Sequence, residues 1–326
     1  MSDVVSADGP ILDEIMRETH KIWHDRLSPH AYEQFYRAQL KTSWAQGNLR
    51  RVALMDGRAV LASVKLYSLD AVLDAQPIRV CGLGAVFTQP RHRGKGHARE
   101  LIERVLEDAS RSGLALALLF SEIGKDYYAR MGFTAVPTCD LTFRVAPPPP
   151  RLGAPATLVR AGDERDLDGL VALGRTRAEP FRFHLDRNRA LIQYAITKQR
   201  LRAGLAPPGT RELQFFVAEE GVTPAAYIVL AVESNAWSLQ ECGDRDPTGA
   251  RIGAMLQVLL ARDPTQPLPA ITGRFPPGFL PPQMTIVATA ESHEVMMVRS
   301  LGGKPGPPVS PGLTESDVLY WRGDLF

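Results

Sequence analysis

The chain has few cysteines, and none of them is placed to build a site with another. Cys81, Cys139 and Cys242 are the three cysteines among 326 residues, and no two of them stand at CxxC spacing. Neither a disulfide framework nor a cysteine zinc site is therefore predicted. We expect no metal in the functional site.

Long apolar runs and an excess of one charge are also missing. No uncharged apolar segment approaches the length of a membrane-spanning helix, and the first residues show neither the basic region nor the apolar core of a secretory signal. We therefore predict a cytoplasmic protein that does not bind membranes. The 38 basic and 36 acidic residues give a net charge of +2, which does not favour broad binding of nucleic acid. The oligomeric state stays open.

What the chain does have is enough length and apolar content for two folded domains. A proline-rich segment at residues 147–156 marks the expected boundary, because consecutive prolines favour an extended, semi-rigid spacer. We predict a first domain at residues 1–146, a linker at 147–156 and a second domain at 157–326.

The first domain alternates between helical and extended patterns, which predicts an α/β fold with helices on the faces of a mixed sheet. The expected elements are helices at 11–27 and 30–46, a hairpin of strands 49–55 and 59–67, a strand at 79–87, a helix at 97–111, a buried strand at 114–120, a short helix at 126–131 and a strand at 138–145.

The second domain repeats this rhythm more weakly, which is compatible with a duplication. Its expected elements are helices at 163–175, 187–203 and 252–261, and strands at 213–219, 225–232, 236–241 and 268–272.

The stretch that carries chemistry is residues 84–99, read as a strand, a basic glycine-rich loop and the first turn of a helix. The free N–H groups at a helix N-terminus bind anions. Gly94 and Gly96 let the backbone approach such an anion closely, and Arg93 and Lys95 add positive charge. The pattern therefore indicates a phosphate-binding site.

Two common nucleotide motifs are excluded at this loop. A P-loop needs Ser or Thr after its Gly-Lys pair, whereas Gly96 follows Lys95. A Rossmann fingerprint that starts at Gly82 would need glycine where Phe87 stands.

The loop resembles a different family. Residues 93–98, Arg-Gly-Lys-Gly-His-Ala, are similar to the acyl-CoA motif Arg/Gln-x-x-Gly-x-Gly/Ala of the GCN5-related N-acetyltransferase (GNAT) superfamily. Residues 127–133, Tyr-Tyr-Ala-Arg-Met-Gly-Phe, resemble the Tyr-x-Lys/Arg-x-Gly-Phe/Tyr pattern that ends the acetyl-CoA site in that family. The resemblance is clearest over residues 80–137 and implies a GNAT fold for the first domain, with acetyl-CoA as co-substrate.

Closer resemblances concern two branches of the superfamily. Residues 86–98 and 119–128 look like the fungal lysine N6-acetyltransferases, which also carry a second domain. Ser121-Glu122 and residues 128–133 are similar to the Eis-type acetyltransferases, whose terminal carboxylate enters the active site. The resemblance implies a degenerate GNAT-like second domain that forms the acceptor site, and makes the Phe326 carboxylate a candidate base.

The resemblance also implies which residues bind acetyl-CoA. Backbone groups of the strand would pair with the pantetheine arm, and the helix N-terminus would hold the pyrophosphate. The predicted cofactor-binding residues are Val86, Phe87, Thr88, Arg93, Gly94, Lys95, Gly96, His97, Ala98, Arg99 and Ser121. An acidic segment, residues 243–249, precedes the corresponding helix of the second domain, and we expect that domain not to bind CoA.

Transfer to an amine requires two proton movements. By motif position, Tyr128 is the candidate acid that protonates the departing CoA thiolate. Glu122, a water molecule or the Phe326 carboxylate would accept the proton of the amine. No cysteine has a motif for an acyl-enzyme, so we expect direct transfer.

The predicted function is acetyl-CoA-dependent N-acetylation of a primary amine on a small molecule, with lysine or another amino acid as the leading acceptor. The alternatives are a protein N-acetyltransferase and a non-enzymatic acyl-CoA-binding sensor.

Overall fold

The structure is a computed structural model, and it describes residues 2–147, 158–234, 236–261, 269–276, 278–302 and 311–326. Contacts divide the chain into two units. The first comprises Met1–Thr138, His293–Glu315 and Phe326, and the second comprises Cys139–Ser292 and Ser316–Leu325. Each unit is built around its own sheet.

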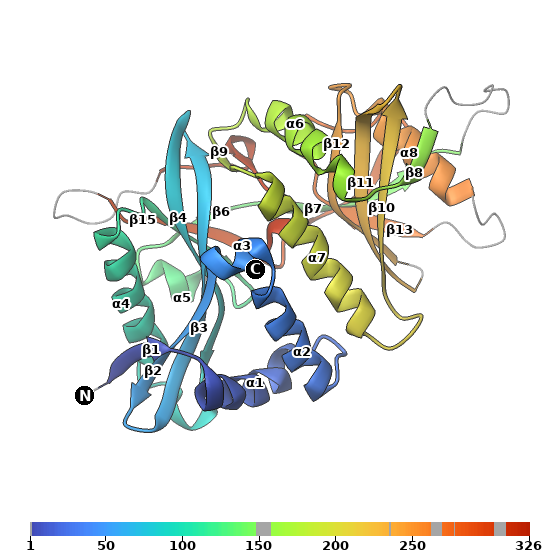
Figure 1. The fold of residues 1–326 in the computed structure, drawn as a ribbon. Helices are drawn as coiled ribbons and strands as arrows, with labels where there is room; N and C mark the ends of the chain where they lie inside the picture. The colour runs from blue at the N-terminus through green and yellow to red at the C-terminus, as the bar shows by residue number, and fades with distance from the viewer. Residues whose placement is uncertain (1, 148–157, 235, 262–268, 277, 303–310) are drawn as a thin grey trace. The chain divides into compact units, whose positions relative to one another are not determined.

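The sheet of the first unit follows the strand order β1-β2-β3-β4-β5-β15-β6, and its one parallel pair along this path is β4 with β5 (Figure 1). These strands are β1 (Asp3–Ser6), β2 (Leu49–Asp56), β3 (Ala59–Leu73), β4 (Gln76–Thr88), β5 (Leu116–Ser121), β15 (Val295–Ser300) and β6 (Thr134–Val136). The helices are α1 (Gly9–Trp23), α2 (Pro29–Leu40), α3 (Ser43–Asn48), α4 (His97–Arg111) and α5 (Asp126–Ala129), with a 3-10 turn at Pro90–His92.

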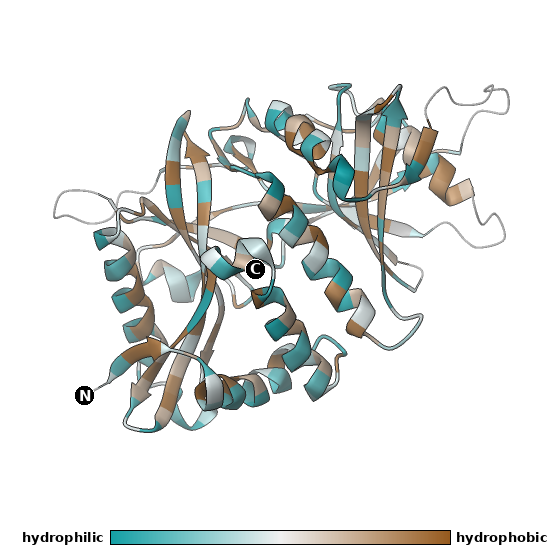
Figure 2. Cartoon of the chain, in the orientation of Figure 1, coloured by the Kyte–Doolittle hydropathy of each residue, from teal (hydrophilic) through white to brown (hydrophobic). Residues whose placement is uncertain are grey.

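Alternation along the strands gives this sheet two apolar faces. Val52 and Leu54 of β2 pack in one core cluster with α4, while Ala53 and Met55 pack in another with α1 and α2. This follows from the two-residue period of a strand, which sends successive side chains to opposite faces. The buried residues of helix α4 recur every three or four positions, which places them on one face as in an amphipathic helix, and both apolar and polar residues are seen along the helix in Figure 2.

The sheet of the second unit has the order β8-β10-β11-β12-β13-β7-β14, and its one parallel pair along this path is β12 with β13. Its strands are β8 (Leu158–Ala161), β10 (Glu212–Glu220), β11 (Thr223–Glu233), β12 (Ala236–Asp244), β13 (Ala270–Gly273), β7 (Cys139–Val145) and β14 (Met284–Glu291). The helices are α6 (Leu167–Ala178), α7 (Arg189–Leu205) and α8 (Ala250–Ala261), and a small pair is formed by β9 (Phe183–Leu185) and β16 (Val318–Leu319). Short 3-10 turns lie at Glu164–Asp166, Glu315–Asp317 and Arg322–Asp324.

The two sheets share one topology. In each, the fourth and fifth strands pair in parallel, and the next strand comes from the other part of the chain: β15 joins β5 in the first unit, and β7 joins β13 in the second. Helix α8 packs against Ile228 and Leu230 of β11, and α6 and α7 pack against Tyr227 and Val229, so both faces of this sheet are also covered.

The predicted α/β class with mixed sheets is confirmed. The strand expected at 138–145 forms as β7, but it pairs in the second unit's sheet rather than the first. The contact units therefore do not coincide with the ranges 1–146 and 157–326, because a residue pattern predicts a strand without its partner. Residues 148–156 of the predicted linker lie outside the described residues.

Candidate active site

The glycine-rich loop is shaped by left-handed backbone positions. Gly94 has a φ of 76° and Gly96, the N-cap of α4, a φ of 84°. A Cβ at either glycine would meet nothing within 4 Å, so the backbone conformation and not crowding demands glycine there. The loop connects the end of β4 to the first turn of α4. The first N–H groups of a helix have no hydrogen-bond partner within the helix.

A cavity of about 480 Å³ opens at this loop, within the first unit. Its lining comes from the end of α1, the end of β4, the loop with the first turn of α4, and the region around α5. The lining residues are Ile22, Trp23, Val86, Phe87, Thr88, His92, Arg93, Gly94, Gly96, His97, Ala98, Arg99, Ile123, Tyr127, Tyr128, Arg130 and Met131. The structure thus gathers the predicted cofactor residues on one cavity, except Lys95 and Ser121.

Tyr128 is the buried tyrosine of the adjacent pair. Its side chain packs edge-on against Tyr127 and Phe133, at ring-centroid distances of 5.0 and 6.0 Å. Burial raises the pKa of Tyr128 to about 12, with smaller contributions from Tyr127 and the charge of Glu122. The phenol therefore keeps its proton at neutral pH and can donate it into the cavity.

Ser121, the last residue of β5, and Glu122, which follows it, lie in different environments. The Ser121 hydroxyl is buried and donates to the carbonyl oxygen of Gly124 at 2.6 Å, which fixes the turn before α5. Glu122 is exposed and does not line the cavity. Of the two predicted catalytic residues, the structure brings Tyr128 to the cavity and leaves Glu122 near it.

Strand β4 bulges just before it reaches the cavity. The register against β3 shifts so that Ala85 and Val86 stand opposite Val64 alone, and Ala85 has a φ of 46°. The parallel pairing of β4 with β5 ends at Leu83, before the bulge begins. The strand ends therefore separate beside Val86, which lines the cavity.

Arg51 supports this bulge and was not picked out from the sequence. Its guanidinium donates to the carbonyl oxygen of Ala85 at 3.3 Å and lies over the ring of Tyr36, 5.6 Å from the centroid. The side chain is 3% exposed, and this burial lowers the pKa of Arg51. Little in the sequence indicates this, because Arg51 stands next to a second arginine, Arg50, which is exposed.

Phe326 lies on the same sheet, beside the glycines of β4. Its ring stacks on Tyr67 at a centroid distance of 4.5 Å and meets Phe120 edge-on at 5.3 Å. A Cβ at Gly84 would lie 3.0 Å from the carbonyl carbon of Phe326, and one at Gly82 would lie 2.7 Å from its ring. Glycine at these positions therefore makes room for Phe326.

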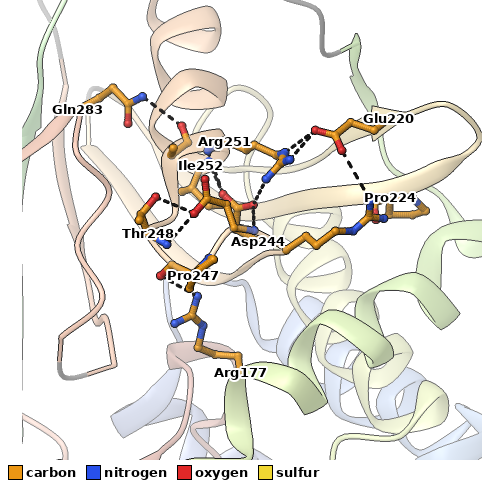
Figure 3. Close-up of polar contacts among 12 residues, drawn as sticks. Arg177, Glu220, Pro224, Asp244, Pro247, Thr248, Arg251, Ile252 and Gln283 are labelled. Carbon is orange, nitrogen blue, oxygen red and sulfur yellow. Dashed lines mark hydrogen bonds and ion pairs between the residues drawn. The ribbon is translucent and has the colours of Figure 1, made fainter.

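In the second unit, the corresponding helix N-terminus is already filled (Figure 3). The buried carboxylate of Asp244 accepts hydrogen bonds from the backbone N–H groups of Arg251 and Ile252, at 2.9 and 3.4 Å. The Arg251 guanidinium also binds Asp244, at 3.2 Å, and reaches Glu220 at 2.6 Å. An internal carboxylate thus occupies the place where a bound anion would sit.

Comparison with known proteins agrees with this geometry. Residues 11–136 match a family model described as an acetyltransferase (GNAT) domain. No curated protein matches the chain. The matched segment includes the strand, loop and helix that line the cavity.

Solved structures resemble the chain over most of its length. A GCN5-related N-acetyltransferase from Anabaena variabilis ATCC 29413 has a TM-score of 0.69 at 14% identity, over 93% of this chain and 73% of that one. A conserved protein from Enterococcus faecalis V583, described as a probable N-acyltransferase, has a TM-score of 0.66 at 13% identity, over 92% and 72%. Eis1 from Mycobacterium abscessus has a TM-score of 0.54 at 15% identity, over 92% and 74%. At these identities the likeness concerns the fold, and the resemblance to fungal lysine N6-acetyltransferases stays a prediction.

Among the residues that the structure describes, no helix is long and apolar enough to cross a membrane. Within the same part of the chain, no cluster of three or more His, Cys, Asp or Glu side chains could hold a metal ion.

Proposed function

We propose that the first unit transfers an acetyl group from acetyl-CoA to a primary amine of a small molecule. The observation that carries the proposal is the cavity of about 480 Å³, which joins a glycine-rich helix N-terminus to a buried, protonated Tyr128. A cradle for an anionic cofactor and a proton donor on one wall are the two parts that acyl transfer from a thioester needs.

The donor half of the reaction is supported by the loop and the strand. The amides of Gly94 to Arg99 are suited to the CoA pyrophosphate, because the first turn of a helix carries unpaired donors and a partial positive charge. The extended pantetheine arm would pair with backbone groups of residues 86–88, as an added strand does. The N–H of Val86, next to the bulge, is the proposed donor to the thioester carbonyl as negative charge develops there.

The acceptor half requires a base, because an alkyl amine with a pKa of about 10 is mostly protonated at neutral pH. Glu122, a water molecule and the Phe326 carboxylate remain the proposed candidates. Tyr128 would then protonate the thiolate that leaves. One C–N bond forms and one C–S bond breaks, while the protonated amine loses two protons. The base takes the first and releases it to solvent, and the second, lost as the amide forms, is matched by the proton that sulfur gains from Tyr128.

We further propose that the second unit binds no CoA. The N-terminus of α8 has its amides bonded to Asp244, whose side chain is fully buried. A pyrophosphate would have to displace this carboxylate and accept the repulsion of Glu220 beside it. The second unit therefore serves some purpose other than binding the acyl donor.

The test is a panel of amines offered with acetyl-CoA, with release of free thiol as the readout. The panel contains lysine, other amino acids, polyamines and lysine-containing peptides. Thiol release with small amines supports the proposal, and the best acceptor identifies the substrate class. Release with peptides alone would identify a protein acetyltransferase, and binding of acetyl-CoA without transfer to any amine would identify a sensor.

A further inference from the structure

A further cavity, of about 330 Å³, lies within the first unit, and the proposed reaction does not use it. It is bounded by the C-terminal half of α4, the end of α3, the start of β2, the middle of β3 and the first half of β4. It shares no described lining residue with the cavity of the proposed acetyl-CoA site. Along α4, Asp108 of this cavity is about 15 Å from Ala98 of the other, at 1.5 Å per residue. The two cavities are therefore separate sites.

Strand register places polar and apolar side chains together on one face of the sheet. Arg50 of β2 pairs with Leu66 of β3, and Ser68 of β3 pairs with Cys81 of β4. Residues that pair directly, or that stand two apart on one strand, share a face. Arg50, Ser68, Cys81 and Arg79 thus lie on the face of Leu66, which is the face that packs against α4.

The inner wall of this cavity is apolar. Leu66, Cys81, Val105 and Ala109 line it and are each at most 9% exposed. The short side chains of Cys81 and Ala109 leave volume that larger residues would fill. Burial raises the pKa of the Cys81 thiol to about 11, so the thiol is uncharged at neutral pH. The inner wall is therefore suited to the apolar part of a ligand.

Two arginines lie where the cavity meets solvent. Arg50 and Arg79 both line the cavity, and both are exposed. The Arg79 guanidinium donates to the Ser68 hydroxyl at 3.3 Å. Within the part of the chain that the structure describes, neither arginine forms an ion pair with a carboxylate. Two such guanidinium groups beside an apolar wall are suited to a planar anion, which they bind through paired N–H donors.

The opposite wall limits the charge of that anion. Asp108, which pairs with the exposed Arg111, lines the cavity together with the end of α4. The C-terminal end of a helix carries partial negative charge, so a dianion such as phosphate is repelled more strongly than a monoanion. Two arginines and one aspartate leave a single positive charge on the lining, which one carboxylate neutralises.

We propose that this cavity, which we call the arginine cavity, binds a small organic monocarboxylate. Arg50 and Arg79 hold the carboxylate, and the apolar body of the ligand enters beneath α4 against Leu66 and Val105. Ligand cavities measure about 300 to 1,000 Å³, so this one takes a molecule of the size of benzoate or hexanoate. The inference goes beyond the proposed acetyl transfer, and none of its steps involves acetyl-CoA.

The experiment is a calorimetric titration of the wild-type protein with benzoate and with hexanoate. We expect saturable binding of both probes, with a Kd that is the same in the presence and absence of coenzyme A. Benzyl alcohol, which keeps the ring and lacks the charge, binds at least roughly 10-fold more weakly, because hydrogen bonds to charged groups are the stronger ones. Inorganic phosphate also binds more weakly than benzoate in the presence of coenzyme A.

Substitutions at the two arginines test which groups hold the carboxylate. Arg50→Gln and Arg79→Gln each raise the Kd of benzoate by roughly 10-fold or more. Arg58→Gln is the matched control, since Arg58 is an exposed arginine in the turn between β2 and β3 and lines neither cavity. All three positions are exposed, so thermal unfolding stays close to that of the wild type.

Amide chemical shifts locate the bound probe without any turnover. Benzoate shifts the amides of residues 79–81 and 108–114, whereas coenzyme A shifts those of residues 93–99. If the wild type acetylates no amine and benzoate still binds in this way, the proposed function fails and the arginine cavity stands. An active wild type without this binding has the opposite meaning.

Three results would overturn the inference. The first is the absence of saturable binding of either carboxylate at a concentration of about 10 mM. The second is binding of benzoate that persists unchanged when Arg50→Gln and Arg79→Gln are combined. The third is phosphate that binds as tightly as benzoate and depends on the same two arginines, which would contradict the choice of a monocarboxylate.

Discussion

At the scale of the residue, burial changes the acid–base behaviour of Tyr128. A phenol in water has a pKa near 10, and burial in the first unit raises the pKa of Tyr128 to about 12. The raised value keeps the proton in place over the working range of the protein. The motif indicated this residue, and the structure adds that its side chain is buried on the wall of the cavity.

Replacing Tyr128 with Phe keeps the ring and removes the proton. We expect kcat to fall by roughly 100- to 10,000-fold, the range that a positioned general acid contributes, with little change in the Kd of acetyl-CoA. Because a raised pKa keeps the donor form intact until the pH nears 12, the wild-type rate loses nothing to Tyr128 between pH 7 and 10. The readout is steady-state thiol release across that range.

Glu122→Gln is the matched variant, since Glu122 lies near Tyr128 but not on the cavity. A large fall in kcat with loss of the acidic limb of the pH profile would identify Glu122 as the base. A rate close to the wild type would move that role to water or to the Phe326 carboxylate. Full activity of Tyr128→Phe would remove Tyr128 as the acid.

Some residues near the cavity could be predicted from the sequence and others could not. Gly94, Gly96 and Tyr128 stand in local motifs, so their role could be predicted from the residues next to them in the sequence. Arg51 and Phe326 reach β4 from distant parts of the chain, and their partners Ala85 and Gly84 are set by strand register. No local pattern encodes such a pairing.

At the scale of the element, α4 and the loop before it form the proposed acetyl-CoA site. The helix was predicted from its apolar face, and its observed bounds, His97–Arg111, agree with the expectation. Both of its ends are shaped by glycines with positive φ: Gly96 at the start and Gly113 just beyond the end, at 84° and 79°. The two glycines therefore allow one substitution at the loop to be compared with the same substitution at the far end of the helix.

Gly96→Ala and Gly113→Ala each place a Cβ in open space but in a left-handed conformation. Each costs about 1 to 2 kcal/mol of strain, so both lower the stability of the fold by a similar amount. Only Gly96→Ala weakens acetyl-CoA binding, by roughly 5- to 30-fold. The strain at residue 96 is relieved when the loop leaves the conformation that binds the pyrophosphate, whereas residue 113 lies at the other end of the helix. Titration calorimetry beside thermal unfolding checks this, and equal Kd values for the two variants would contradict it.

Strands were predicted less completely than helices. The residues of β2, β3 and β4 alternate or run apolar, and their positions were expected. Strands β14 and β15 were not expected, and β7 was assigned to the wrong sheet, because a strand that joins a distant partner has no nearby turn to reveal the pairing.

At the scale of the whole molecule, two sheets of one topology differ in what fills their equivalent sites. The first presents an open helix N-terminus beside a cavity, whereas the second has Asp244 on the amides of α8. We therefore predict one acetyl-CoA per chain. Calorimetric titration would give a stoichiometry of one, and a second site of similar affinity would contradict the assignment of Asp244.

The most direct test of the central claim follows the acetyl group itself. The wild-type protein is incubated with acetyl-CoA that carries a trideuterated acetyl group and with the best acceptor of the amine panel, and the products are weighed by mass spectrometry. We predict that the labelled acetyl group appears on the amine nitrogen, at a rate that falls sharply in Tyr128→Phe. Consumption of acetyl-CoA with no labelled amine, or equal labelling without protein, would contradict it.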